Sequence, residues 1–100
     1  MNDFTLKIYR LCQQIPKGKV ATYQQLAILA GYPKAARAVG MCMKHNPNAP
    51  HIPCHRVVAS DGKLTGYSAG KGIETKRQML QDEGVHFSDE KVDLAQSQWD

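Results

Sequence analysis

Residues that end helices recur at short intervals along this chain, so any helix it forms is short. Apolar residues with helical spacing between Phe4 and Ile15 predict a first helix, which Asp3 opens and which Pro16 and Gly18 end. Proline lacks a backbone donor, and glycine favours the conformation that follows a helix. We therefore expect helices of only a few turns.

The next two predicted helices form a helix-turn-helix. Thr22 and Gln25 have the spacing of a capping box, which begins a helix that Gly31 ends. After a short turn, a third helix is expected from about Lys34 to Lys44. This motif places its second helix in a groove of DNA, although small helical domains also contain the pattern by chance.

The second half of the chain predicts one short strand element and one more helix. Val57 and Val58 favour a strand, and Pro53 stiffens the chain before them. The expected elements are a strand over residues 56–60, a turn at Asp61-Gly62, a returning strand over 63–65, a loop over 66–70, and a helix over 72–83 with Ile73, Arg77 and Leu80 on one side and Gly84 at its end. The predicted fold class is α/β, mainly helical: a small single domain, residues 1–100, with a winged-helix-like helix-turn-helix and a short strand element near Cys54.

Charge is divided unevenly along the chain, which carries a net charge of +4. Up to Arg77 it holds twelve of the thirteen Lys and Arg residues but only three acids, and after Arg77 it holds six acids and only Lys91. A basic body followed by an acidic tail suits a polyanionic partner, of which nucleic acid is the usual one. Charge alone also fits a solvated surface.

Cysteine usage and hydropathy argue against several classes of protein. The three cysteines are odd in number and lack a CxxC spacing, so we expect no disulfide framework and a cytoplasmic location. Charged residues interrupt the N-terminal apolar run, and no segment approaches the roughly 20 apolar residues of a membrane span. A metal site is conceivable but not expected, because its candidate ligands fit no zinc spacing: Cys42, His45, His51, Cys54 and His55.

Cys54 is a candidate nucleophile because His55 follows it directly. A thiol reacts as the thiolate, and a neighbouring proton acceptor promotes its formation. The pair alone also fits a buried, unreactive cysteine beside a surface histidine. A thiol hydrolase would explain Cys54 and His55 but not the basic charge. A helix-turn-helix transcription regulator would explain the charge but not the cysteine motif.

Several motifs occur in order along the chain: Ile15-Pro16-Lys17-Gly18-Lys19-Val20, Thr22-Tyr23, Pro33-Lys34-Ala35-Ala36-Arg37-Ala38-Val39-Gly40, Asn46-Pro47, Pro53-Cys54-His55-Arg56-Val57, Gly66-Tyr67-Ser68 and Glu83-Gly84. Together they resemble the DNA-binding, active-site domain of the O6-alkylguanine-DNA alkyltransferases, the methylated-DNA–protein-cysteine methyltransferases. They also resemble that family's non-transferring relatives, the alkyltransferase-like proteins. The resemblance extends from about Phe4 to Gly84.

The resemblance implies binding of duplex DNA that contains O6-alkylguanine, with the damaged base flipped out at a cost of roughly a few kcal/mol. Arg37 matches the arginine finger that takes the vacated place, and Tyr23 matches the tyrosine that crowds the 3′ phosphate. Both side chains are therefore expected to face outward. Small residues would let the helix approach the minor groove: Ala35, Ala36, Ala38 and Gly40. Without the resemblance, Arg37 fits an exposed helix position, and Tyr23 and the small residues fit packing.

For alkyl transfer, Cys54 resembles the nucleophile, His55 the base that takes its proton through a water, and Glu83 the group that orients His55. Asn46 resembles the residue that ties the helix-turn-helix to the active-site loop. Transfer of this kind is irreversible and needs no metal or organic cofactor. The resemblance also implies a lesion pocket that contains Pro53, Val57, Tyr67 and Ser68.

Other features resemble the alkyltransferase-like proteins, which bind the lesion and hand it to nucleotide excision repair. The chain resembles them in its stand-alone length, without the N-terminal domain of most alkyltransferases, and in a tail with Val92-Asp93-Leu94 and Trp99. Ala69 also replaces a glycine of the family's usual Gly-Gly pair. Those relatives carry Trp or Ala where Cys54 stands here. A transferase and a lesion sensor therefore both remain open, and in either case we expect a monomer.

Overall fold

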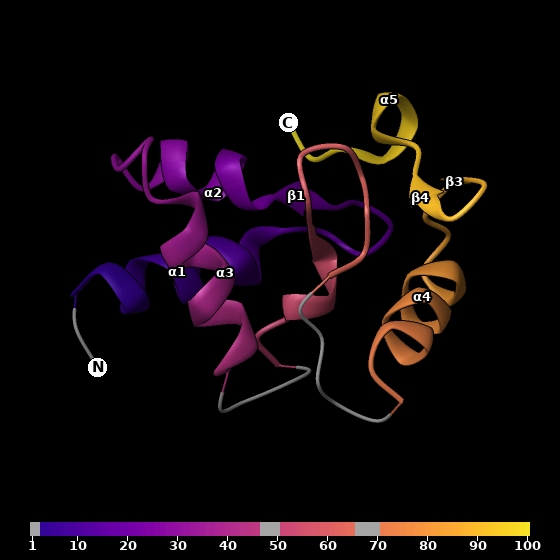
Figure 1. Cartoon of the computed structure of the whole chain (residues 1–100), viewed down its shortest axis with the longest axis horizontal. Coiled ribbons are helices and arrows are strands. Elements are labelled where there is room, and N and C mark those ends of the chain that lie inside the picture. Colours follow the sequence, from indigo (N-terminus) through magenta and orange to yellow (C-terminus); the bar gives the residue numbers. More distant parts are fainter. Residues whose placement is uncertain (1–2, 47–50, 66–70) are drawn as a thin grey trace.

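Two groups of elements lie side by side in the computed structural model, which describes residues 3–46, 51–65 and 71–100 (Figure 1). The first contains helices α1 (Asp3–Gln14), α2 (Tyr23–Leu29) and α3 (Ala36–Lys44). The second contains α4 (Ile73–Asp82), β3 (Phe87–Ser88), β4 (Lys91–Val92) and α5 (Leu94–Ser97). Between them lie β1 (Ala21–Thr22), β2 (Val57–Val58) and the 3-10 helix η1 (Cys54–Arg56). The mainly helical fold class is confirmed.

Helices α1, α2 and α3 share one apolar core, to which they contribute the fully buried Ile8, Leu26 and Val39. The predicted capping box at the start of α2 is present. Gln25 N donates to Thr22 Oγ1 over 2.9 Å, and Thr22 N donates to Gln25 Oε1 over 3.3 Å. A capped start of this kind stabilises a helix by about 1 kcal/mol, which matters for a helix of only seven residues.

Helix α3 begins at Ala36, two residues later than predicted. Ala35 N donates to Tyr32 O over 2.9 Å, and Ala35 has φ −102° and ψ 22°, outside the helical range. Lys34 therefore belongs to the turn that connects α2 to α3, and the helix-turn-helix itself is present as predicted.

The predicted short strand element near Cys54 is present, but its strands are parallel, so the hairpin expected over residues 56–65 is wrong. Strand β2 covers only residues 57–58 and pairs with β1, with Ala21 opposite Val57. The turn at residues 61–62 is present, but Lys63 then bridges Lys91 in the antiparallel sense, and the described residues 63–65 form no strand along β2. Both residues of β2 are fully buried, which is typical of a parallel strand covered on both faces.

Helix α4 ends where predicted, with Gly72 and Glu83 as its caps, and the side shared by Ile73, Arg77 and Leu80 is only partly buried. Lys76 and Leu80 are buried, whereas Ile73 is 37% exposed. Leu80 belongs to a second apolar cluster with residues of β2 and β4. Lys76 can occupy this buried position because its amine donates hydrogen bonds to backbone carbonyls.

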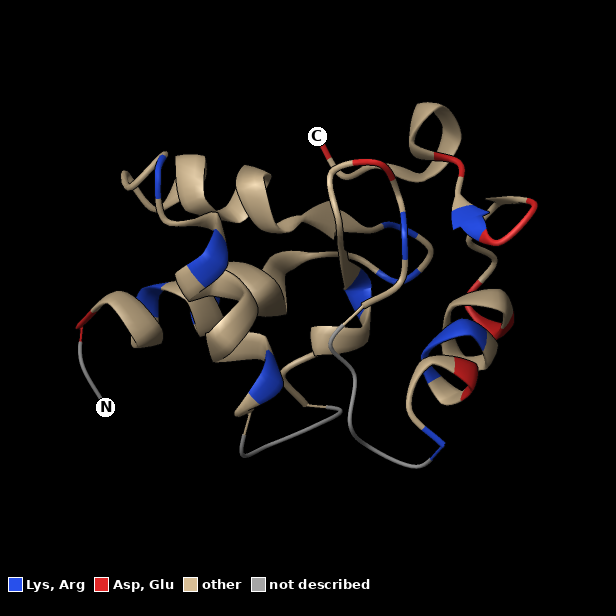
Figure 2. Cartoon of the chain, viewed as in Figure 1, with Lys and Arg blue, Asp and Glu red and all other residues tan. Residues whose placement is uncertain are grey.

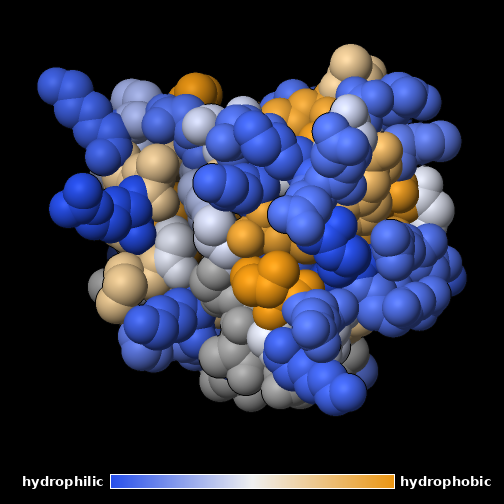
Figure 3. Space-filling view, turned by 45° about the vertical axis from the view of Figure 1, so that its right-hand side comes forward, coloured by the Kyte–Doolittle hydropathy of each residue, from blue (hydrophilic) through white to orange (hydrophobic). Residues whose placement is uncertain are grey.

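The segment after Gly84 folds back onto the protein through the apolar residues of the tail. Val92 is buried in the second cluster, Phe87 and Leu94 pack against it, and Trp99 packs against the core of α1–α3. Figure 2 shows acidic residues concentrated from α4 onward. Figure 3, which brings this side forward, shows a mostly hydrophilic face with patches of apolar surface between the hydrophilic residues. Among the described helices, none is long and apolar enough to cross a membrane.

Candidate active site and nucleic-acid interface

Cys54 follows a tight bend that a side chain from the first half of the chain holds in place. Pro53 has φ −79° and ψ 67°, and Cys54 N donates to Ile52 O over 2.8 Å, which is the geometry of an inverse γ-turn. Asn46 Nδ2 donates to the same Ile52 oxygen over 2.7 Å. Cys54 begins η1 and is only 7% exposed. The structure thus brings Asn46 from the end of α3 against the cysteine loop.

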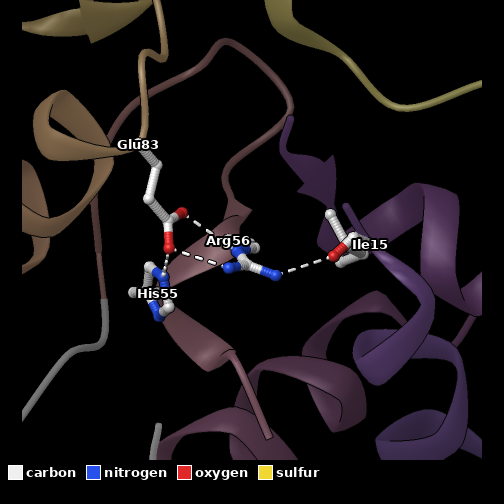
Figure 4. A network of polar contacts seen from close by, with 4 residues as sticks. All are labelled: Ile15, His55, Arg56 and Glu83. Atoms are coloured by element: carbon white, nitrogen blue, oxygen red, sulfur yellow. Dashed lines mark hydrogen bonds and ion pairs between the residues drawn. The ribbon is translucent and has the colours of Figure 1, made fainter. Parts of the chain in front are cut away.

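His55, Arg56 and Glu83 form one polar network (Figure 4). His55 Nε2 lies 3.1 Å from Glu83 Oε2. Arg56 donates to both oxygens of the same carboxylate, from Nε over 3.0 Å and from Nη2 over 2.8 Å, and its Nη1 donates to Ile15 O over 2.8 Å. A bidentate pair of this kind fixes both partners. Arg56 is part of the sequence motif but had no role assigned to it. In the structure it holds the Glu83 carboxylate in place.

Hydrogen bonding determines which nitrogen of His55 can accept a proton. The Glu83 carboxylate only accepts, so His55 Nε2 carries the hydrogen that it donates. In the neutral ring Nδ1 then has a free lone pair, and this buried atom has no hydrogen-bond partner within the described residues. Burial lowers the pKa of His55 from its ordinary 6.5, outweighing the opposing effect of Glu83. His55 is therefore a neutral base at pH 7.

Glu83 is ionised at neutral pH. Partial burial raises the pKa of this carboxyl, but hydrogen bonds from Arg56 and His55 outweigh burial and hold the pKa below its ordinary 4.5. A carboxylate beside the imidazole favours its cationic form during proton uptake. In this network His55 is thus placed as the base, and Glu83 is the group that orients it.

Lys76 is a buried site residue that the sequence did not reveal. Its Nζ donates to Val57 O over 2.7 Å and to Thr65 O over 2.8 Å, and the residue is 1% exposed. Burial lowers the pKa of Lys76 to about 8. The sequence did contain one signal of its burial: Lys76 stands four residues before Leu80, and residues four apart share one face of a helix. The carbonyl of Val57, a residue of the implied lesion pocket, therefore already has a donor.

Arg37 and Tyr23 line one open groove, together with Gln24, Ala36 and residues Ala59 and Ser60 of the turn after β2. Arg37 is exposed, as predicted. Tyr23 is only half-buried, and its hydroxyl lies 3.2 Å from both Thr65 O and Thr65 Oγ1. The expectation that Tyr23 points outward is therefore wrong in part, because its hydroxyl is held against the chain after β2.

The small residues in α3 and directly before it divide into two groups. Ala35 packs against the apolar core, so it serves packing. Ala38 is exposed, and Ala36 borders the groove. Gly40 has open space around it: a Cβ added there would meet nothing within 4 Å among the described residues. Glycine inside a helix costs about 0.5–1 kcal/mol relative to alanine, so internal packing does not explain Gly40.

Two of the candidate pocket residues, Tyr67 and Ser68, lie outside the described residues, as does Ala69. Pro53 and Val57 are both buried beside Cys54. Within the described residues, no group of three or more His, Cys, Asp or Glu side chains is arranged to hold a metal ion. Cys12, Cys42 and Cys54 are all free thiols.

Comparison with known proteins identifies the family. The model of the 6-O-methylguanine DNA methyltransferase, DNA binding domain, matches residues 3–85. The chain belongs to this family. A methylated-DNA–protein-cysteine methyltransferase of Methanosarcina barkeri is 47% identical over 72 residues, which are 72% of this chain and 46% of the relative. The chain spans half or less of the length of such curated methyltransferases.

Solved structures of the methyltransferase family and of Atl1 share the fold. Schizosaccharomyces pombe Atl1, in complex with damaged DNA containing O6-carboxymethylguanine, has a TM-score of 0.84 and 33% identity, over 100% of this chain and 97% of Atl1. Mycobacterium tuberculosis OGT, in complex with DNA, has a TM-score of 0.78 and 44% identity, over 84% of this chain and 51% of OGT. Residues 86–100 thus lie outside the family model but within the match to Atl1.

Proposed function

We propose that this protein recognises O6-alkylguanine in duplex DNA and takes the alkyl group onto Cys54. Family membership and the DNA-bound structural neighbours support the substrate class. The observation that carries the transfer is a thiol at position 54 directly before a buried, neutral histidine whose ring a carboxylate orients. A protein that only bound the lesion would need neither the thiol nor this base.

In the proposed step, the Cys54 proton passes through a water to His55 Nδ1, and the thiolate sulfur attacks the alkyl carbon of the lesion. An S–C bond forms as the C–O6 bond breaks, and the electron pair of that bond stays on guanine. Guanine takes up the proton, so the products are S-alkylcysteine and unmodified guanine. The step involves no oxidation or reduction and consumes the protein, because the new thioether is stable.

The face of α3 supports the binding part of the proposal. Arg37 is exposed beside the groove that Tyr23 also lines, and Gly40 leaves open space on the same helix. Close approach of a minor groove to the helix backbone would use that space. An exposed arginine next to it has the length and charge to enter the place of a flipped base.

Mass spectrometry of the intact protein tests the transfer. After incubation with a duplex that contains O6-methylguanine, we expect the protein to gain one methyl group in place of a thiol hydrogen. Peptide mapping should place the methyl group on Cys54 and leave Cys12 and Cys42 unmodified. Cys54→Ser should gain nothing while it still binds the duplex. Tight binding without any mass gain would contradict the transferase proposal.

The second candidate function is a lesion sensor that binds without transfer and passes the damage to nucleotide excision repair. The observation that favours it is the match to Atl1 over the whole chain, including residues 86–100. The same mass measurement separates the two functions, because a sensor binds the duplex and keeps its mass. Binding of unmodified operator DNA instead would indicate a transcription regulator.

Arg37→Ala is expected to weaken binding of a lesion duplex by about tenfold to a hundredfold, with little change for undamaged duplex. The reason is that Arg37 would offset the cost of an unpaired base, which arises only when a base is flipped. Fluorescence anisotropy titrations with both duplexes measure the ratio of affinities. Arg10→Ala is the matched control, since it removes the same charge from an exposed position on α1. Equal losses in the two variants would mean that Arg37 acts only as a charge.

A further inference from the structure

The C-terminal segment joins the edge of the small sheet beside Cys54. Val20 N donates to Ser97 O over 2.8 Å, and Trp99 N donates to Val20 O over 2.7 Å, so Val20 and Gln98 form a parallel bridge. In Figure 1 this segment runs from α5 back toward β1. Because β1 pairs with β2, which directly follows η1, the segment lies one strand away from the cysteine loop.

The same segment reaches the capping box at the start of α2. Gln25 Nε2 donates to Trp99 O over 2.5 Å, and Gln98 Nε2 donates to Gln25 Oε1 over 3.0 Å. That oxygen also accepts from Thr22 N. One side chain, Gln25, therefore connects the tail to the first turn of α2, whose first residue is Tyr23.

Helix α2 needs such support because it has only seven residues. A helix this short is not stable alone, so its position depends on its caps and on tertiary contacts. Tyr23 is held at its hydroxyl by Thr65 and at its backbone by the capped first turn. A shift of about 1 Å in a positioning group can cost on the order of a hundredfold.

We propose that residues 97–99 act as a brace that positions Tyr23 for lesion recognition through Gln25, with Gln98 as the main positioning residue of the tail. The inference rests on the proposed lesion binding. It assigns a role to a segment that lies outside the family model. In this role the tail supports helix α2, whose first residue, Tyr23, acts on the damaged strand. The brace leaves undamaged DNA bound as before, because it controls where Tyr23 lies and not the charge of α3.

The test compares lesion and undamaged duplexes in titrations with three variants. Gln98→Ala removes the side-chain bond to Gln25 but keeps the backbone pairing with Val20, whereas a chain ending at Gln98 keeps that side-chain bond and loses the two Trp99 contacts, with Gln25 and with Val20. Both should lower the preference for the lesion duplex by about threefold to tenfold. Gln96→Ala is the matched control, because the Gln96 amide bonds only to Asp93 within the tail. It should leave the preference unchanged.

A double-mutant cycle with Tyr23→Ala separates a positioning role from general stabilisation. If the brace acts through Tyr23, Gln98→Ala has no further effect on lesion preference once Tyr23 is alanine. Additive effects would overturn the proposal, and so would an unchanged preference in both tail variants. Trp99 is the single tryptophan, so its emission checks that Gln98→Ala remains folded. A wild-type protein with no lesion preference would contradict the proposed function itself, whereas intact discrimination in both tail variants would contradict the brace alone.

Discussion

Replacing His55 with alanine is expected to slow alkyl transfer to Cys54 by about a hundredfold to ten-thousandfold, the usual range of general base catalysis. Nδ1 of the neutral ring carries a lone pair with no partner within the described residues, and Glu83 holds the ring through Nε2. Without the ring, the thiol loses the acceptor for its proton. Single-turnover transfer, with lesion duplex in excess, measures the rate. Binding of the duplex should change far less than the rate.

The pH dependence of the same rate follows from the direction in which the pKa of His55 is shifted. Burial lowers the pKa of His55 below 6.5, so the ring stays neutral as the pH falls from 7 to 6.5. The transfer rate should therefore hold over that interval and decline only at lower pH. Below pH 6.5 the unfolded chain binds this proton before the folded protein does, so the His55 contribution to stability is also lost as the pH falls.

His51→Ala is the control for the His55 variant, since it removes an exposed imidazole three residues before Cys54. It should leave the transfer rate unchanged. A His55→Ala protein that transfers at the wild-type rate would show that another group accepts the proton. A decline of the wild-type rate already above pH 6.5 would contradict the neutral histidine.

Local rules predicted the helices well because the sequence near each helix end contains the necessary chemistry. Thr22 and Gln25 form the capping box that their spacing predicted, and Gly84 follows the end of α4. The boundary of α3 was wrong by two residues because Ala35 forms a turn bond to Tyr32, and no side chain in the turn signals that choice.

The errors concern partners that are distant in the sequence. Val57 pairs in parallel with Ala21, across 36 positions, whereas the local turn signal at residues 61–62 suggested a hairpin. Lys76 received no role from the sequence, yet it is buried and its amine donates to two backbone carbonyls. The family motifs implied that Glu83 orients His55, and the structure has the contact between these two side chains. Their linkage through Arg56 appears only in the structure.

Arg56→Met is expected to lower the free energy of unfolding by about 3 kcal/mol at pH 7. The variant leaves the Glu83 carboxylate in a largely buried site without its bidentate partner, and removing one member of a buried ion pair costs about 3–5 kcal/mol. The Ile15 carbonyl also loses its donor. Urea unfolding at pH 7 measures the change. Arg56→Lys keeps the charge without the fork and should lose less.

The cost of Arg56→Met should shrink in acid. Hydrogen bonds from Arg56 and His55 outweigh the opposing effect of burial and hold the pKa of Glu83 below 4.5, so the stability that this shift provides is present above pH 4.5 and is lost as the pH falls through the lowered value. Unfolding curves of wild type and variant should therefore converge below pH 4.5. A stability difference that stays constant from pH 7 into this range would indicate that Arg56 acts through packing instead of through Glu83.

The same variant should change the pH dependence of transfer. Burial is the main cause of the low His55 pKa, and the positive charge of Arg56 lowers it further. When that charge is removed, Lys76 is the one remaining cation among the described residues that opposes Glu83 at the imidazole, so the pKa of His55 rises. The acid decline of the transfer rate should then begin at higher pH in Arg56→Met than in wild type, and Arg56→Lys should keep the wild-type position. An unshifted decline in Arg56→Met, in a protein still folded at that pH, would mean that the arginine supports the site without tuning its base.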